Sequence, residues 1–118
     1  MFPFEKLEVW HKALEFADSV YRLTKSFPDD ERFGLTSQMR RAAVSVASNI
    51  AEGSARYSRN DFAHFIEIAT GSLFEVVTQA AIGRGQGYLS EAQYSELYAF
   101  AEEHGKMLSG LRRSLTAP

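Results

Sequence analysis

The sequence predicts an all-α protein, an antiparallel up-down-up-down four-helix bundle in which residues 1–118 form a single domain. Apolar residues recur at intervals of three and four along the chain, and no segment sustains the alternation of a strand. The strongest break signals are the three prolines and the glycine-rich run at 83–87, which leave long segments joined by short loops. Short connections favour antiparallel neighbours. We expect helices at about residues 5–26, 30–53, 59–83 and 91–115.

The first expected helix carries two apolar stripes where a surface helix needs only one. One stripe consists of Leu7, Trp10, Leu14, Ala17 and Tyr21. The other consists of Val9, Ala13, Phe16, Val20, Leu23 and Phe27. Two stripes indicate that this helix is covered on two sides. Phe27-Pro28 ends it, because a residue before proline avoids the helical region.

The second expected helix begins near Asp29 or Asp30, since either residue is a good N-cap. Gly53 is interpreted as the residue just past its end. Alanine and serine are dense between residues 42 and 55. Because small residues let helices approach closely, we expect this helix to make the most crowded contact of the bundle.

Both remaining helices begin with capping signals. Ser58 opens the third helix, with Asp61 three residues later as a variant of the capping box. Ser90 and Gln93 form a capping box for the fourth helix. Gly71 lies within the third helix, where glycine costs about 1 kcal/mol relative to alanine. We interpret Gly71 as the mark of a close backbone approach.

The formal net charge of −2 is distributed unevenly. Residues 33–59 contain four basic residues and one acidic residue, and residues 104–118 contain three basic residues and no acidic one. Residues 60–103 contain one basic residue and seven acidic ones. The overall balance argues against a general polyanion-binding protein, but the segregation permits a local basic surface.

Several classes of protein are disfavoured by composition. The chain has no cysteine, so it has neither a disulfide framework nor a thiolate metal site. Its fully apolar runs are only a few residues long, against the roughly 20 residues of a membrane span. Its first residues lack the basic start and apolar run of a signal peptide. We expect a cytoplasmic protein that does not contact a membrane.

Local strings distributed over nearly the whole chain carry a resemblance to a known family. They are FEKLEVW at 4–10, Phe27-Pro28, GLTSQMRRAAVSV at 34–46, NIAEG at 49–53 and GSLFE at 71–75. With these strings the chain resembles the four-helix bundle family that includes the 23S rRNA intervening-sequence proteins.

The resemblance implies a bundle that assembles into a barrel-like homopentamer. It also implies a relationship to the accessory variability determinant of diversity-generating retroelements, which partners a reverse transcriptase and binds nucleic acid through a basic surface. The present chain departs from that relative in its acidic balance.

A line of polar residues follows one face of the second expected helix. Together with one residue of the third helix, this polar seam comprises Gln38, Arg41, Ser45, Ser48, Asn49, Glu52 and Glu75. One interpretation is a polar channel or ligand site between helices or subunits. The other, which we favour, is a structural network in which Arg41 is buried against Glu75 or Glu52 and fixes the register of the helices.

No combination of residues predicts catalysis or a metal centre. A di-iron bundle needs a Glu-x-x-His pair on each of two helices, and only Glu8 and His11 fit, since Asp61 replaces the glutamate before His64. The glycines at 83–87 follow a helix and not a strand, so they do not form a phosphate loop. There is no Gly-x-Ser-x-Gly motif. We expect no cofactor, no metal and no enzymatic activity.

The best candidate for nucleic-acid binding is a basic end of the bundle. In an antiparallel arrangement, the loop between the second and third helices lies beside the end of the fourth helix. This basic end comprises Arg56, Tyr57, Arg59, Lys106, Arg112 and Arg113. Tyr57 is available for base stacking. The other interpretation is that the same cations complement helix dipoles on a solvated surface.

The sequence thus favours a non-enzymatic homo-oligomer, a pentamer by resemblance, that acts as a nucleic-acid-associated accessory protein binding RNA or DNA at its basic end. The alternative is a protein-interaction scaffold, a ring with an acidic outer face that does not bind nucleic acid.

Overall fold

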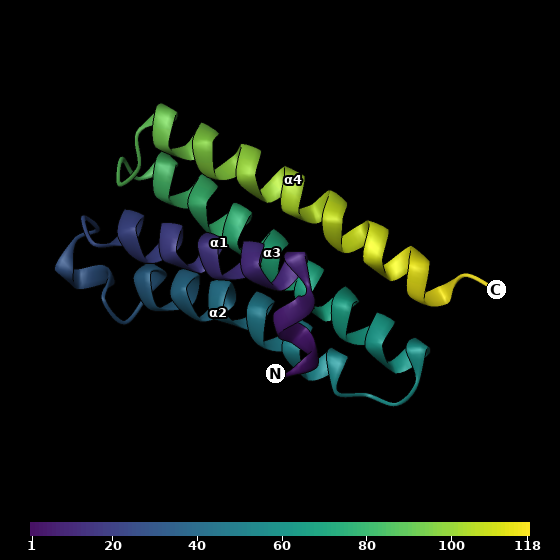
Figure 1. The fold of residues 1–118 in the computed structure, drawn as a ribbon. Helices are drawn as coiled ribbons and strands as arrows, with labels where there is room; N and C mark the ends of the chain where they lie inside the picture. The colour runs from purple at the N-terminus through teal and green to yellow at the C-terminus, as the bar shows by residue number, and fades with distance from the viewer.

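Four α-helices run side by side in the computed structural model, which describes residues 1–118 (Figure 1). The elements are η1 Pro3–Lys6, α1 Glu8–Thr24, η2 Asp29–Glu31, α2 Leu35–Ser54, α3 Arg59–Gly85 and α4 Glu91–Thr116, where η denotes a 3-10 turn. α1 and α3 each pack against both α2 and α4, so in cross-section the helices occupy the corners of a square. The bundle is 47 Å long and 22 by 21 Å across. The predicted all-α four-helix bundle is confirmed.

The core uses one apolar stripe of each helix. In α1 this is the second predicted stripe, of which Ala13, Phe16 and Val20 are completely buried. The first predicted stripe is only partly covered: Leu7, Trp10 and Ala17 are half-buried against the core, whereas Leu14 and Tyr21 are 40% and 41% exposed. A single copy of the bundle therefore covers α1 fully on only one side.

The connection between α1 and α2 differs from the prediction. Residues 29–31 form the separate turn η2, and α2 begins only at Leu35, because Gly34 has a φ of −112° and a ψ of −114° that interrupt the helical path. Glu31 still caps α2, since its Oε1 accepts a hydrogen bond of 3.1 Å from the Leu35 amide. The other carboxylate oxygen of Glu31 accepts a bond from the Tyr88 hydroxyl.

Neither glycine singled out in the sequence has its predicted role. Gly53 does not follow α2 but lies inside it, facing α3, where an added Cβ would lie 2.8 Å from Phe65 Cβ and 2.9 Å from Phe62 Cδ1. A Cβ at Gly71 would meet nothing within 4 Å, so the predicted close approach at that position is wrong. The crowded contact predicted for α2 is its contact with α3, the most extensive in the bundle.

The predicted capping box of α4 is confirmed, whereas at α3 only the cap by Ser58 forms and Asp61 makes no return bond. Ser58 Oγ accepts a hydrogen bond of 2.9 Å from the Asp61 amide. At the start of α4, Ser90 Oγ accepts from the Gln93 amide, and Gln93 Oε1 accepts from the Ser90 amide at 2.9 Å. Gly87 supplies the left-handed conformation between α3 and α4, with a φ of +81°.

α3 is the one helix whose length and apolar composition would suffice to cross a membrane. In this fold it is a bundle helix that packs on α2 and α4. Its apolar residues extend beyond the core stripe, and Phe74 and Ile82 are 65% and 51% exposed. A helix that is apolar on several faces is normally covered on several faces.

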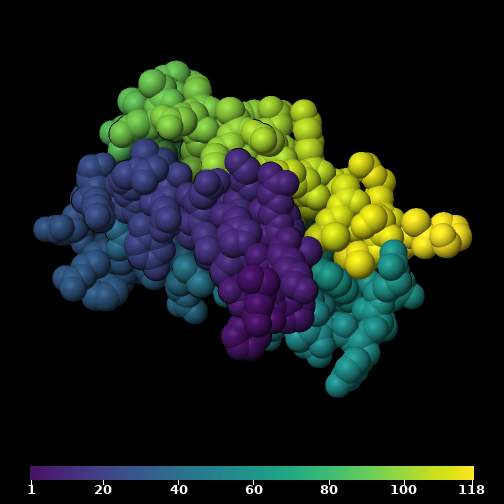
Figure 2. All heavy atoms as spheres, viewed as in Figure 1, coloured from purple at the N-terminus to yellow at the C-terminus, as the bar shows by residue number.

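The bundle is uneven at one end. α1 has 17 residues and α3 has 27, which correspond to about 25 Å and about 40 Å at 1.5 Å per residue. The last turns of α4 and the α2–α3 loop therefore project past the start of α1, and Figure 2 shows both protruding at the same end. The predicted basic end lies on this projection except for Lys106, which follows His104 by two residues and is level with the start of α1.

One buried histidine joins α4 to the start of α1. His104 is 1% exposed and its Nε2 donates a 3.0 Å hydrogen bond to the Val9 carbonyl. Because a carbonyl oxygen only accepts, this bond assigns the proton of the neutral imidazole to Nε2, and Nδ1 is buried without a partner. Burial lowers the pKa of His104 below its ordinary value, with a smaller contribution from the charge of Lys12.

We expect Gly53→Ala to destabilise the bundle by about 1–3 kcal/mol, because Phe62 and Phe65 must move to accept the methyl group. The matched control is Gly110→Ala, where an added Cβ meets nothing within 4 Å, and which should stabilise by about 0.5–1 kcal/mol. Urea unfolding at one fixed protein concentration measures both. Equal effects of the two substitutions would contradict the close approach.

We expect the free energy of unfolding to decrease as the pH falls below about 6.5. The native state keeps His104 neutral while the unfolded chain takes up the proton, so this stability is present above the unfolded-state pKa and is lost as pH falls toward the native pKa. His104→Asn, which still offers a donor to Val9, should flatten this dependence. Urea unfolding between about pH 5 and pH 7.5 tests it, and an unchanged slope in the variant would assign the dependence to other groups.

Candidate functional site

The basic end predicted from the sequence is assembled, but two of its arginines are engaged within the chain. Arg59 donates to the carbonyl oxygens of Ser114 and Leu115, the latter at 3.2 Å. These carbonyls belong to the last turn of α4, so Arg59 complements the negative end of that helix. The contact also places the α2–α3 loop beside the end of α4, as the antiparallel arrangement predicts.

The second engaged arginine is Arg112. Its Nε donates to Glu67 Oε1 at 2.7 Å, so the pair joins α4 to α3 across their exposed surface. The hydrogen bond from Arg112, followed by its charge, lowers the pKa of Glu67 below the usual range of a glutamate. Much of the local field of Arg112 is cancelled by this carboxylate.

The remaining basic groups are exposed and have no carboxylate within 4.0 Å. They are Arg56, Lys106 and Arg113. The guanidinium carbon of Arg56 lies 4.5 Å from the centroid of the Phe65 ring, and Tyr57 beside it is fully exposed. The free part of the basic end is therefore three cations and one aromatic ring, fewer than the five cations counted in the sequence.

Four of the seven residues of the polar seam line an open groove of about 490 Å³ between α2 and α3: Gln38, Arg41, Ser45 and Glu75. Arg41 and Glu75 both line the groove, and both are exposed. No carboxylate lies within 4.0 Å of Arg41, so the buried network with Glu75 or Glu52 is not formed. Charged groups at the mouth of an open groove remain hydrated, so an ion pair between them would contribute little stability.

The inner part of the seam is held by hydrogen bonds among small side chains. Asn49 Nδ2 donates to the Ser45 carbonyl at 2.8 Å and to Ser45 Oγ at 2.9 Å. Ser72 of α3 donates to the same Ser45 Oγ at 2.9 Å. Of the other predicted members, Gln38 lines the groove, whereas Ser48 and Glu52 are exposed outside it.

The sequence interpretation missed Gln79, which lines the same groove and whose Oε1 is buried without a partner. The spacing of Ser72, Glu75 and Gln79 at three and four residues places them on one face of α3. That spacing is the signal that could have found it.

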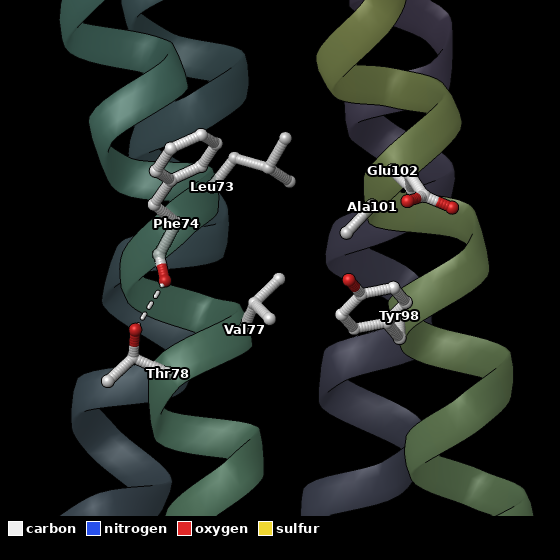
Figure 3. Close-up of a pocket in the computed structure, with 7 residues that line it drawn as sticks. All are labelled: Leu73, Phe74, Val77, Thr78, Tyr98, Ala101 and Glu102. Carbon is white, nitrogen blue, oxygen red and sulfur yellow. Dashed lines mark hydrogen bonds between the residues drawn. The ribbon is translucent and has the colours of Figure 1, made fainter.

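A second, apolar groove of about 310 Å³ lies between α3 and α4 and was also missed. This α3–α4 groove is lined by Leu73, Phe74, Val77, Thr78, Tyr98, Ala101 and Glu102. Figure 3 shows Leu73 and Val77 reaching from α3 toward Ala101 and Tyr98 on α4. The signal in the sequence is Phe74, a large aromatic residue off the core stripe of its helix.

The histidines and carboxylates do not gather. No group of three His, Asp or Glu side chains lies close enough to hold a metal ion. His11 Nε2 instead donates to the Glu5 carbonyl at 2.7 Å, and His104 bonds Val9.

Comparison with known proteins agrees with this fold. Residues 5–110 match the sequence model of the family described as 23S rRNA-intervening sequence protein. The chain belongs to this family. The intervening-sequence bundle is also similar, with a TM-score of 0.82 and 26% identity, to a crystal structure from Bacteroides thetaiotaomicron described as a protein with unknown function from the S23 ribosomal protein family. The match covers 89% of the present chain and 95% of that one. No match was found among curated proteins.

Proposed function

We propose that this intervening-sequence family protein is a non-enzymatic homo-oligomer of the cytoplasm, a ring of five copies, that binds RNA or DNA through its basic end. Its role is that of an accessory protein to a nucleic acid, as in the retroelement accessory protein that the sequence resembles.

The observation that carries the proposal is apolar surface that a single copy leaves exposed. Tyr21 on α1, Val44 on α2, and Phe74 and Tyr98 on the opposite helix pair are between 41% and 65% exposed. Fully burying a large apolar side chain contributes about 1.5–3 kcal/mol. Several such residues on each copy supply a driving force for assembly.

Nucleic-acid binding is supported by the free cations of the basic end. Arg56, Lys106 and Arg113 are too few for tight binding by one copy, but a ring brings five such sets together, and linked weak contacts add as avidity. Tyr57 offers an exposed ring for stacking on an unpaired base. The family description, which refers to 23S rRNA, points to the same class of ligand.

The competing function is a protein-interaction scaffold that binds no nucleic acid. It is favoured by the engagement of Arg59 and Arg112 and by the carboxylate of Glu67 within the basic end. The acidic exposed residues of α4, including Glu96 and Glu103, would then form the outer face of the ring.

Assembly is tested by multi-angle light scattering of the purified protein. We expect a mass of five chains of 13.2 kDa each. A single-chain mass across the accessible concentration range would overturn the oligomer, and a different multiple would correct the number of subunits.

Nucleic-acid binding is tested by fluorescence anisotropy of a labelled single-stranded RNA between about 50 and 200 mM salt. Affinity should fall steeply with salt. Neutralising one cation, as in Arg113→Ser, should make the slope of log binding constant against log salt concentration less steep by about 1 for each subunit that contacts the RNA. Lys25→Ser, at the opposite end of the bundle, is the control. Absent binding at the lowest salt would eliminate this function and leave the scaffold.

A further inference from the structure

Five of the eleven large apolar residues that are exposed lie on two opposite sides of the bundle. One side is the α3–α4 groove, and the other, the α1–α2 face, is formed by Leu14 and Tyr21 of α1 with Arg40 and Val44 of α2. In Figure 3, which looks into the groove, the ribbons of α1 and α2 lie behind α3 and α4. The other two sides are more polar: the α2–α3 seam described above, and an α1–α4 side lined by residues including Arg22 and Glu96.

The α1–α2 face is held in place by contacts of Arg40. Arg40 crosses from α2 to α1, where its Nε donates to Thr24 Oγ1 at 2.8 Å and its Nη2 donates to the Tyr21 carbonyl at 3.3 Å. Its guanidinium carbon lies 4.7 Å from the centroid of the Tyr21 ring. Leu14 lies two helical turns before Tyr21, and Val44 one turn after Arg40, so these side chains project from the same side.

The α3–α4 groove is complementary in shape and charge. It is concave and mostly apolar, and its charged lining residue is Glu102. Phe74 and Tyr98 stand at its walls, 65% and 47% exposed. The α1–α2 face instead presents exposed apolar side chains around the cation Arg40, with Asp18 exposed between Leu14 and Tyr21. An apolar surface with a cation matches an apolar groove with a carboxylate.

We infer that the α1–α2 face of one copy packs into the α3–α4 groove of the next copy, an inference that rests on the proposed oligomer. The alternative is that each surface pairs with itself about a two-fold axis. Self-pairing of the α1–α2 face would oppose two Arg40 side chains. Self-pairing of the groove would bring two Glu102 side chains together and leave an unfilled space between the two concave surfaces. A contact between unlike surfaces on opposite sides of a subunit generates a ring when the rotation closes.

The inference is tested by breaking each surface separately and then mixing the variants. Leu14→Glu damages the face and keeps the groove, whereas Phe74→Glu damages the groove and keeps the face. Each variant alone should be monomeric by light scattering. A one-to-one mixture should form dimers of two 13.2 kDa chains, because one intact face meets one intact groove. Ala92→Glu, in the exposed first turn of α4, should assemble like the wild-type chain.

The outcomes that contradict this interface differ from the outcome that contradicts the proposed oligomer. A wild-type chain that assembles while either variant stays at full size, or forms dimers alone, rules out the contact between unlike surfaces. A monomeric wild-type chain rejects the oligomer itself. Circular dichroism shows whether both variants keep their helices.

A second measurement uses milder substitutions and the absence of cysteine in the native chain. Val44→Cys and Tyr98→Cys are prepared separately, mixed as subunits, and treated with a short bis-maleimide. Cross-links should join one variant to the other. Cross-links that form equally within a single variant, or not at all, would overturn the inference even if the glutamate variants fail to fold.

Discussion

Four helices at the corners of a square can bury only one stripe of each helix against a common core, and this geometric limit governs the rest of the molecule. Every helix of the chain supplies such a stripe, with side chains such as Phe16, Met39 and Leu108 completely enclosed. α1 and α3 carry more apolar surface than that arrangement can use. The surplus appears on the outside as Leu14 and Tyr21 on one side and Phe74 on the other. The monomer is therefore complete as a fold but leaves apolar surface that a further copy can bury.

The distribution of charge follows from the same architecture. Because α3 and α4 are longer than α1, their ends project, and the cations of the α2–α3 loop gather beside the last turn of α4. Two cations of this end stabilise the projection itself: Arg59 satisfies terminal carbonyls of α4, and Arg112 ties α4 to Glu67 of α3. The other three, Arg56, Lys106 and Arg113, have no carboxylate within 4.0 Å.

Local features of the chain were predicted well because their causes are local. The caps at Ser58 and Ser90 depend on hydrogen bonds that span three residues, so the sequence contains both partners. The start of α2 was misplaced because Gly34 interrupts the helix, an effect that the favourable cap residues Asp29 and Asp30 concealed. Arg41 was expected to be buried against a carboxylate because spacing gives the face of a helix but not its depth. In the structure that face opens onto a groove, where Arg41 remains hydrated.

The sequence by itself determined the number of helices, their order, the caps that begin α3 and α4, and the presence of two stripes on α1, since periodicity and capping depend on residues within one or two turns of each other. Only the tertiary structure decided which stripe became the core, that Gly53 and not Gly71 admits the neighbouring helix, and which arginines are already engaged. Those outcomes depend on contacts between residues distant in the chain, such as Gly53 with Phe65 or Arg59 with Leu115, and on the depth at which each helix sits in the bundle. Helical spacing contains no information about that depth.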